Sequence, residues 1–290
     1  MDFPIRTVSK RDAEYPPLLL ESVGHPAELH FRGSLPAPHD QCVAIVGTRK
    51  ATREGRALAF ATAETLARRG FVIVSGLALG IDGAAHDGAL AGNGRTIAVL
   101  ANGLDSIYPR QHERLAEDIL EHDGCLISEY PDETPSYPSQ FLERNRIVSG
   151  LSIATVVIEA PLRSGSLATA RNAIEQGREV FVFPGNVHHG NYKGSHKLIR
   201  EGARLVASAD DILEDLGLAD EAPIEMAMPH AEDDAEATIL EVLRNAKEPV
   251  SIDRMCELTT LEPRIISEKL TMLTVRGIIK EHANGFTLNT

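Results

Sequence analysis

Small and hydroxyl-bearing residues follow several predicted strands of this chain, and their types suit the binding of phosphate groups. The turns are Gly47-Thr48-Arg49, Ser75-Gly76 with Gly80 behind it, Asn102-Gly103, Ser164-Gly165-Ser166 and Pro184-Gly185. Glycine lets backbone N–H groups approach a ligand, and the N-terminus of a following helix favours negative charge. Because ligands bind at the carboxyl ends of parallel strands, several such turns together indicate an anion with several phosphates. A nucleotide or a nucleic-acid strand is such an anion.

The segment from Phe141 to Arg146 places an aromatic ring among basic and amide side chains. Phe141 could stack on an unpaired base, while Arg144 and Arg146, on either side of Asn145, could bind phosphates. A structural interpretation has equal weight, with Phe141 in the core and Arg144 paired with an acid such as Glu143. The residues alone leave both interpretations open.

The turns also have ordinary structural interpretations. Gly47-Thr48-Arg49 alone fits a strand-to-helix turn with a surface arginine, and it matches neither the dinucleotide-binding GxGxxG pattern nor the Walker pattern. The hydroxyls of Ser164 and Ser166 could cap the next helix, in which Thr169 also lies. Capping is compatible with a phosphate at the same helix N-terminus.

Asp82 is expected to cap the helix that follows the Ser75-Gly76 turn, with His86 one helical turn later. These two side chains then face one site, or His86 is simply a buried histidine. No Ser, Cys or Lys is paired with a base by any motif, and His188-His189 has no further ligands at suitable spacing. We therefore predict no catalytic residues, no metal site and no cofactor.

Continuous apolar runs alternate with amphipathic or alanine-rich stretches between residues 43 and 207. Such runs are typical of strands buried on both faces. The predicted strands are Cys42–Val46, Phe71–Val74, Thr96–Leu100, Cys125–Glu129, Thr155–Glu159, Glu179–Phe183 and Arg204–Val206. The predicted helices are Glu54–Arg69, Asp82–Ala91, Gln111–His122, Leu167–Gln176 and Lys197–Glu201. This alternation predicts an α/β fold with a doubly wound, mainly parallel sheet.

A second, smaller domain is predicted after an acidic linker at residues 218–234. Helices are expected at Ala235–Ala246, Ile252–Leu258 and Pro263–Val275, and Asn284-Gly285 is a strong hairpin-turn signal. Three helices closed by a hairpin form a winged-helix domain, here residues 235–290. This helix-turn-helix variant binds duplex DNA or is reused for protein contacts.

The length, composition, net charge and cysteine count of the chain argue against several classes of protein. The chain has 290 residues, is 43% hydrophobic and has a net charge of −13, which argues against indiscriminate wrapping of duplex DNA. No apolar run approaches the roughly 20 residues of a membrane span, and no signal-peptide pattern is present. The cysteines at 42, 125 and 256 are far apart and have no CxxC partner, so we expect reduced thiols and a cytoplasmic location.

As an ordered set, the motifs between Tyr15 and Leu216 resemble those of the DNA-processing protein A (DprA/Smf) family. They include the turns described above, the pair Tyr108-Pro109, the segment 141–152 and the long stretch 157–170. The resemblance implies an extended Rossmann-like domain at residues 41–217, preceded by a lead-in at 1–40 that packs on it. The winged helix also matches a common appendage of the family.

The resemblance further implies that the chain binds single-stranded DNA in a basic pocket, forms a homodimer and loads the RecA recombinase onto incoming strands during natural transformation. The family's DNA-contacting residues fall on Arg49, Arg110, Phe141, Arg144, Arg146 and the Ser164-Gly165-Ser166 turn. Two departures from the family pattern are present, Leu79 in place of a common arginine and Leu142-Glu143 inside the basic motif.

The first hypothesis is therefore a non-enzymatic mediator that binds single-stranded DNA. The alternatives are a nucleotide-binding enzyme of similar Rossmann type, related to nucleotide N-glycosidases, and a winged-helix regulatory protein. The enzyme class usually has a PGGxGTxxE signature, which this sequence lacks. Nucleotide turnover would favour the enzyme, and tight sequence-specific binding of duplex DNA would favour the regulator.

Overall fold

The computed structural model describes residues 3–218, 234–246, 249–259, 261–275, 278–282 and 285–288. The chain divides into two compact units, Met1–Ile224 and Glu225–Thr290, each with its own hydrophobic core. The predicted acidic linker lies outside the described residues, except for Leu218 and Asp234 at its ends.

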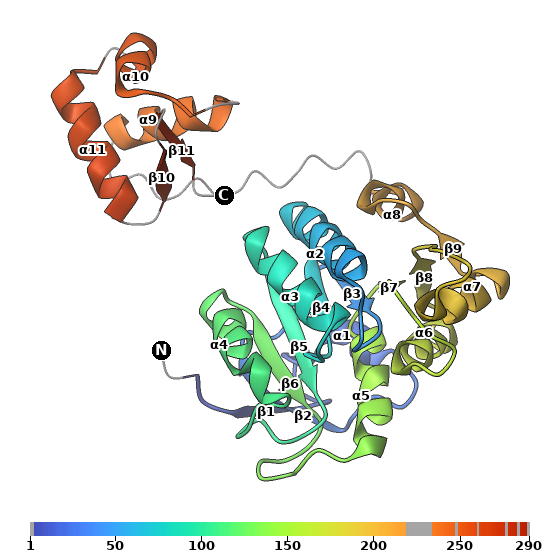
Figure 1. Ribbon diagram of the computed structural model, residues 1–290. Helices are drawn as coiled ribbons and strands as arrows, with labels where there is room; N and C mark the ends of the chain where they lie inside the picture. Colours follow the sequence, from blue (N-terminus) through green and yellow to red (C-terminus); the bar gives the residue numbers. More distant parts are fainter. Residues whose placement is uncertain are drawn as a thin grey trace. The chain divides into compact units, whose positions relative to one another are not determined.

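A nine-stranded sheet runs through the first unit in the order β1-β2-β6-β5-β4-β3-β7-β8-β9 (Figure 1). Neighbouring strands from β6 to β9 in this order are parallel, as the apolar runs predict. The strands are β1 Arg6–Ser9, β2 Glu28–Gly33, β3 Cys42–Val46, β4 Val72–Ser75, β5 Thr96–Leu100, β6 Cys125–Ser128, β7 Ala154–Val157, β8 Glu179–Val182 and β9 Arg204–Leu205.

The N-terminal lead-in joins the sheet, whereas the sequence predicts only that it packs on it. Strand β2 pairs antiparallel with β6, and β1 pairs antiparallel with β2. Buried residues alternate with more exposed ones along β2, which fits a place near the edge of the sheet. The lead-in therefore extends the sheet by two strands.

Helices cover both faces of the sheet (Figure 1). Helices α2, α3, α4 and α8 pack on one face, and α1, α5, α6 and α7 pack on the other. The α-helices are α1 Pro17–Leu20, α2 Arg53–Arg68, α3 Ile81–Ala91, α4 Glu113–Glu121, α5 Pro138–Gly150, α6 Gly165–Glu175, α7 Lys193–Arg200 and α8 Ala209–Asp215, with short 3-10 turns η1 at Arg110–His112 and η2 at Gly190–Tyr192.

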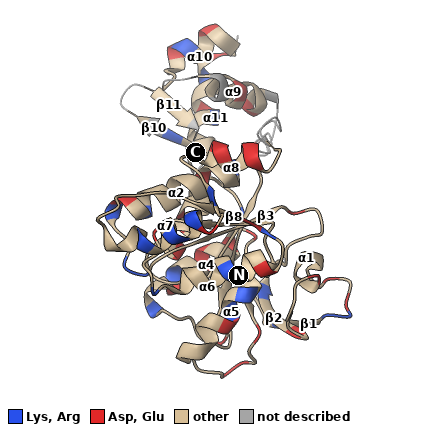
Figure 2. Cartoon of the chain, turned by 90° about the vertical axis from the view of Figure 1, so that its right-hand side faces the viewer, with Lys and Arg blue, Asp and Glu red and all other residues tan. Residues whose placement is uncertain are grey.

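Charge is unevenly distributed over these elements. Figure 2 shows that α8 is strongly acidic, whereas Lys and Arg positions occur along α7. Within the described ranges we find no helix with the length and apolar character needed to cross a bilayer. The three cysteines are free thiols, and two of them are buried.

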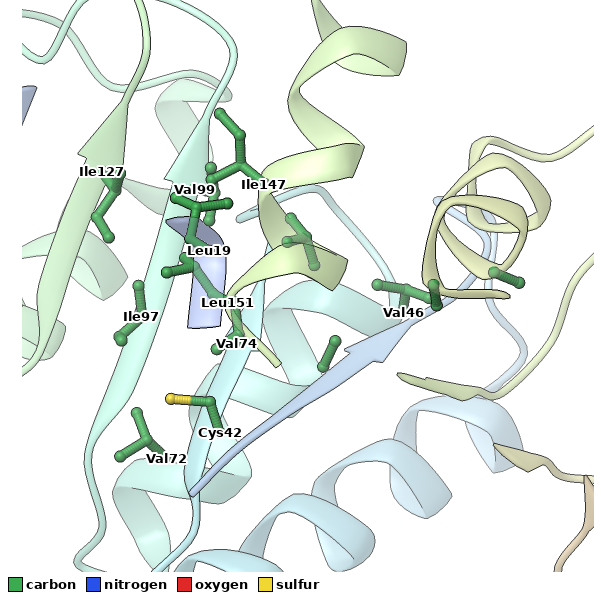
Figure 3. Close-up of a cluster of buried hydrophobic side chains, with 14 of the residues drawn as sticks. Leu19, Cys42, Val46, Val72, Val74, Ile97, Val99, Ile127, Ile147 and Leu151 are labelled. Carbon is green, nitrogen blue, oxygen red and sulfur yellow. The ribbon is translucent and has the colours of Figure 1, made fainter. Parts of the chain in front are cut away.

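The strands are apolar throughout because each face of the sheet meets a helix layer. In β3, Cys42 and Val46 face one layer and Ile45 faces the other. Figure 3 shows the first of these layers, where Leu19 from α1 and Ile147 from α5 lie over the strands. Removing one buried aliphatic side chain from such a core typically costs about 2–5 kcal/mol.

The second unit contains three helices and a two-stranded antiparallel sheet. The elements are α9 Asp234–Asn245, α10 Ile252–Thr259, α11 Pro263–Val275, β10 Ile279–His282 and β11 Gly285–Leu288. Its core contains Ile239, Leu243, Ile266 and Leu270. The predicted helices and strand pair are present, while Asn284 of the predicted turn lies outside the described residues.

Candidate functional site

A cavity of ≈ 450 Å³ opens at the carboxyl edge of the sheet. It lies beside β3, which pairs with β4 on one side and with β7 on the other, so that the strand order changes direction there. Doubly wound sheets bind ligands at this position. Of the residues predicted from sequence, the cavity is lined by Gly47, Thr48, Arg49, Gly76, Phe141, Arg144, Asn145, Ser164, Gly165, Ser166 and Thr169. Four different segments of the chain thus meet at one site.

An aromatic and cationic stack forms one wall of the cavity. The guanidinium carbon of Arg49 lies 4.6 Å from the centre of the Phe141 ring, a cation–π contact. The ring centre of Tyr108 lies 5.6 Å from that of Phe141, and the two rings are tilted relative to each other. Arg49 is exposed and makes no ion pair within the described residues, so its charge is available to a ligand.

The N-terminus of helix α6 lines the same cavity. Ser164 is the N-cap, and its hydroxyl accepts a hydrogen bond from the N–H of Ser166 at 3.3 Å. The side chain of Asn145 donates to the carbonyl of Gly165 at 3.1 Å, which joins α5 to this turn. A Cβ on Gly165 would have Asn145 Nδ2 at 3.8 Å as its nearest neighbour, so the turn is open toward the cavity. This helix end is suited to a phosphate group.

Arg144 lies beneath the cavity and not on its rim. It is only 4% exposed, and its Nη1 donates to the carbonyl of Val99 at 2.5 Å. Its guanidinium occupies the space that a Cβ on Gly76 would need. Burial lowers the pKa of Arg144 to about 10, while nearby Asp82 raises it, so the side chain remains cationic at neutral pH. Arg144 therefore supports the floor and adds positive charge to it.

Asp82 has a different role from the predicted cap. Helix α3 has Gly80 as its N-cap, and the Asp82 carboxylate accepts a hydrogen bond from the N–H of Gly76 at 3.1 Å. Burial raises the pKa of Asp82, whereas Arg144 lowers it. His86 is fully buried against Thr96, with 2.7 Å between Nδ1 and Oγ1, and it does not line the cavity.

Five predicted site residues do not line the cavity. The hydroxyl of Ser75 is buried and donates to the carbonyl of Ile45 at 2.6 Å. Gly80 has a φ of 87° and packs against the backbone at Thr48, which explains why glycine stands there. Gly103 packs against the backbone of the loop after β6.

The two basic residues among these five also lie elsewhere. Arg110 is an exposed residue of the η1 turn. Arg146 forms an ion pair with Glu129, and its side chain lies near Gly24 of the lead-in. Residues two apart on a helix do not share a face, so Arg146 points away from the cavity that Arg144 supports. Contact of these residues with a ligand stays a prediction.

Among the lining residues missing from the predicted set, Tyr108 and Arg163 have side chains suited to a nucleotide. Tyr108 is 46% exposed and stacks near Phe141, and Arg163 is an exposed cation in the loop before α6. The Tyr108-Pro109 pair is a usable sequence signal, and Arg163 lies in the stretch 157–170 that resembles the family. The cavity thus combines exposed arginines and a helix N-terminus with a flat aromatic surface.

The chain is similar to several known proteins. The family model described as DNA recombination-mediator protein A matches residues 6–217. Protein Smf of Escherichia coli is 50% identical over 202 residues, which are 70% of this chain and 54% of that protein. DNA processing protein DprA of Bacillus subtilis is 41% identical over 213 residues, covering 73% of this chain and 71% of that protein. The match thus spans about half the length of the Escherichia coli protein.

Solved structures resemble the same region. DNA processing protein A of Streptococcus pneumoniae matches with a TM-score of 0.69 and 41% identity, covering 74% of each chain. DNA processing protein A of Helicobacter pylori matches with a TM-score of 0.65 and 30% identity, covering 74% of this chain and 96% of that one. The Helicobacter pylori protein is described as having a unique single-stranded DNA binding mode.

Proposed function

The chain belongs to the DNA recombination-mediator protein A family, and from that premise we propose that it binds single-stranded DNA in the cavity beside β3 and β7. The protein would act as a DNA-processing mediator of recombination. The proposal agrees with the single-stranded DNA binding described for the Helicobacter pylori relative.

The observation that supports it most is that the stack of Arg49 on Phe141 and the N-terminus of α6 line one cavity. A nucleotide offers a charged phosphate and a flat base, and the cavity has a group for each. Arg49 and the first N–H groups of α6 suit the phosphate. The rings of Phe141 and Tyr108 suit the base by stacking, which has little sequence preference.

A competition titration tests this proposal. A labelled oligothymidine is bound to the protein, and unlabelled single-stranded DNA, duplex DNA of the same length or free nucleotide is added at fixed salt. We expect single-stranded DNA to compete best, because only unpaired bases can stack on the rings. Equal competition by duplex DNA would contradict the proposal, and so would hydrolysis of the free nucleotide.

We propose a binding role and not a catalytic one. Asp82 is the acid that lines the cavity, and its carboxylate is already engaged by the N–H of Gly76. No pairing of a nucleophile with a general base occurs among the lining residues described above. In this proposal the turns at Gly47 and Ser164, which would suit a nucleotide phosphate, bind the phosphates of the DNA backbone.

RecA loading and a homodimer belong to the same proposal and are supported by family membership. A single cavity of ≈ 450 Å³ holds few nucleotides. Two cavities on one strand would raise the overall affinity, because the second binding event becomes intramolecular. RecA would then meet a strand that is held open, during natural transformation or recombination.

We propose that residues 235–290 form a winged-helix domain joined by the acidic linker at 218–234. Three helices with the strand pair β10–β11 support this, as does the bridge between Val250 and Phe286 that closes the unit. Exposed residues of α11 include both Arg264 and Glu268, so the face is mixed in charge. A protein contact therefore fits this domain at least as well as duplex DNA.

A further inference from the structure

Three loops meet beside the cavity at the carboxyl edge of the sheet. They are residues 49–53 after β3, residues 160–163 after β7, and residues 186–193 between β8 and the first turn of α7. We name this area the three-loop surface. Arg49 and Arg163 belong both to it and to the cavity lining, so the two areas are continuous.

A buried carboxylate joins the loops. Glu159 follows β7 and is 0% exposed. It accepts hydrogen bonds from the N–H of Thr52 at 3.0 Å and from the Thr52 hydroxyl, and also from Asn191 Nδ2 at 2.9 Å and the Tyr192 hydroxyl at 3.2 Å. Burial raises the pKa of Glu159, but these hydrogen bonds outweigh it and hold the pKa below the usual value. Glu159 is thus an ionised acceptor shared by two of the loops.

Backbone contacts complete the connection. Asn191 Nδ2 also donates to the carbonyl of Lys50 at 3.0 Å, which joins the third loop to the first. The N–H groups of Gly194 and Ser195, at the start of α7, donate to the carbonyl of Ala160 at 2.8 Å and 3.1 Å. The three loops therefore form one preorganised surface, and binding to it requires little further ordering.

The three-loop surface is rich in exposed basic side chains. Its exposed basic side chains, none of which forms an ion pair within the described part of the chain, are Arg49, Lys50, Arg53, Arg163 and Lys193. Besides Glu159, Glu54 in the first turn of α2 also acts electrostatically on Tyr192. Blue positions on α7 mark part of this charge in Figure 2. The surface is locally basic although the whole chain has a net charge of −13.

Flat rings accompany these charges. The ring centre of Tyr192 lies 5.9 Å from that of His189 and 6.4 Å from that of His196. Val187 next to them is 68% exposed, and His188 and His189 are exposed as well. A combination of unpaired cations and exposed rings is what single-strand-binding grooves use.

We propose that the three-loop surface binds the DNA strand as it leaves the cavity, with the cations on its phosphates and the rings of the 186–193 loop against its bases. This inference rests on the proposed function, because the strand reaches the surface from the cavity. It adds a second contact area near β8. In the strand order, β8 lies beyond β3 and β7 from β5, the strand that precedes Tyr108. A strand long enough to span both areas would bind more tightly than one confined to the cavity.

Charge reversal tests the inference on the full-length chain. The double variant Arg53→Glu/Lys193→Glu places acids in the first turns of α2 and α7, where the helix dipole favours them, so folding should be retained. The matched control is Arg200→Glu, which reverses an exposed charge in the last turn of α7. Affinity is measured over a range of salt with oligothymidines of roughly 4 and roughly 16 nucleotides, the limits of typical site sizes.

We expect the double variant to bind the short oligomer like the wild type and the long oligomer more weakly. With the long oligomer, the slope of log affinity against log salt should fall by roughly 0.7 for each phosphate that the variant no longer neutralises. An unchanged slope and affinity for the long oligomer would overturn the inference while leaving the cavity as the binding site. Failure of the proposed function looks different, because Arg49→Ala would then bind the short oligomer as tightly as the wild type.

Discussion

The guanidinium carbon of Arg49 lies 4.6 Å from the centre of the Phe141 ring, although Arg49 belongs to the turn after β3 and Phe141 to helix α5. This contact holds a phosphate-binding group and a base-stacking group side by side at one wall of the cavity. Within the described residues Arg49 forms no ion pair, so its guanidinium can bind a ligand directly.

Loss of the Phe141 ring should weaken DNA binding without unfolding the protein. Phe141→Leu keeps an apolar side chain but removes the stacking surface, and we expect a loss of about 1–3 kcal/mol in binding single-stranded DNA. Phe141→Tyr keeps a ring and should bind nearly as the wild type does. Fluorescence anisotropy with an oligothymidine measures both affinities, and equal affinity of the Leu variant and the wild type would exclude stacking on this ring.

Two glycines of the cavity should respond differently to alanine. Gly76→Ala forces the Arg144 guanidinium from its site, and overpacking of this kind costs about 1–3 kcal/mol. Gly165→Ala meets only Asn145 Nδ2 at 3.8 Å and should leave the free energy of unfolding nearly unchanged. Urea unfolding of the two variants decides the matter. If Gly76→Ala is as stable as Gly165→Ala, Arg144 does not need its present position.

Several features of the site follow from sequence patterns, and others depend on tertiary packing. The apolar runs predict the parallel strands, and a parallel sheet brings the turns at Gly47, Gly76 and Ser164 to one edge. Helix α5 is not predicted, because its buried face contains polar residues such as Arg144 and Asn145 where an apolar stripe is expected.

The unpredicted helix explains the separation of the two arginines. Without knowledge of α5, Arg144 and Arg146 look like one basic pair, but on a helix they point to different sides. The position of Tyr108 depends on the path of the loop after β5, which no local pattern specifies. Likewise, the use of Glu159 to join two of the loops depends on partners from Thr52 and Asn191, which are far apart in the sequence.

The buried His86 should make the protein sensitive to acid. Burial lowers the pKa of His86 from 6.5 to about 3, so the unfolded chain binds a proton in this range that the folded chain does not. The free energy of unfolding should therefore fall as the pH falls from 6.5, by up to about 1.4 kcal/mol per pH unit from this residue. His86→Gln keeps a donor for Thr96 and removes the titration.

The free energy of unfolding in urea is measured for the wild type and for His86→Gln, at neutral pH and at about pH 4.5, where only the unfolded chain binds the proton. We expect the stability difference between the two conditions to be smaller in His86→Gln than in the wild type. Identical pH dependence of the two proteins would show that His86 has the same pKa in the folded chain as in the unfolded chain.

Deletion of residues 232–290 should leave the binding of single-stranded DNA largely intact, because every residue of the cavity lies in the unit Met1–Ile224. The truncated and complete chains are compared by gel shift with the same oligothymidine. A total loss of binding in the truncated chain would move the main site to the second unit.

The most direct test of the cavity as the DNA site is the affinity of Arg49→Ala for a short oligothymidine at fixed salt, beside Arg200→Ala as a control of equal charge change. A lost charge-assisted hydrogen bond is worth about 1.5–3 kcal/mol, so we expect affinity to fall at least tenfold in Arg49→Ala and to stay at the wild-type value in Arg200→Ala. Wild-type affinity in a folded Arg49→Ala variant would contradict the account.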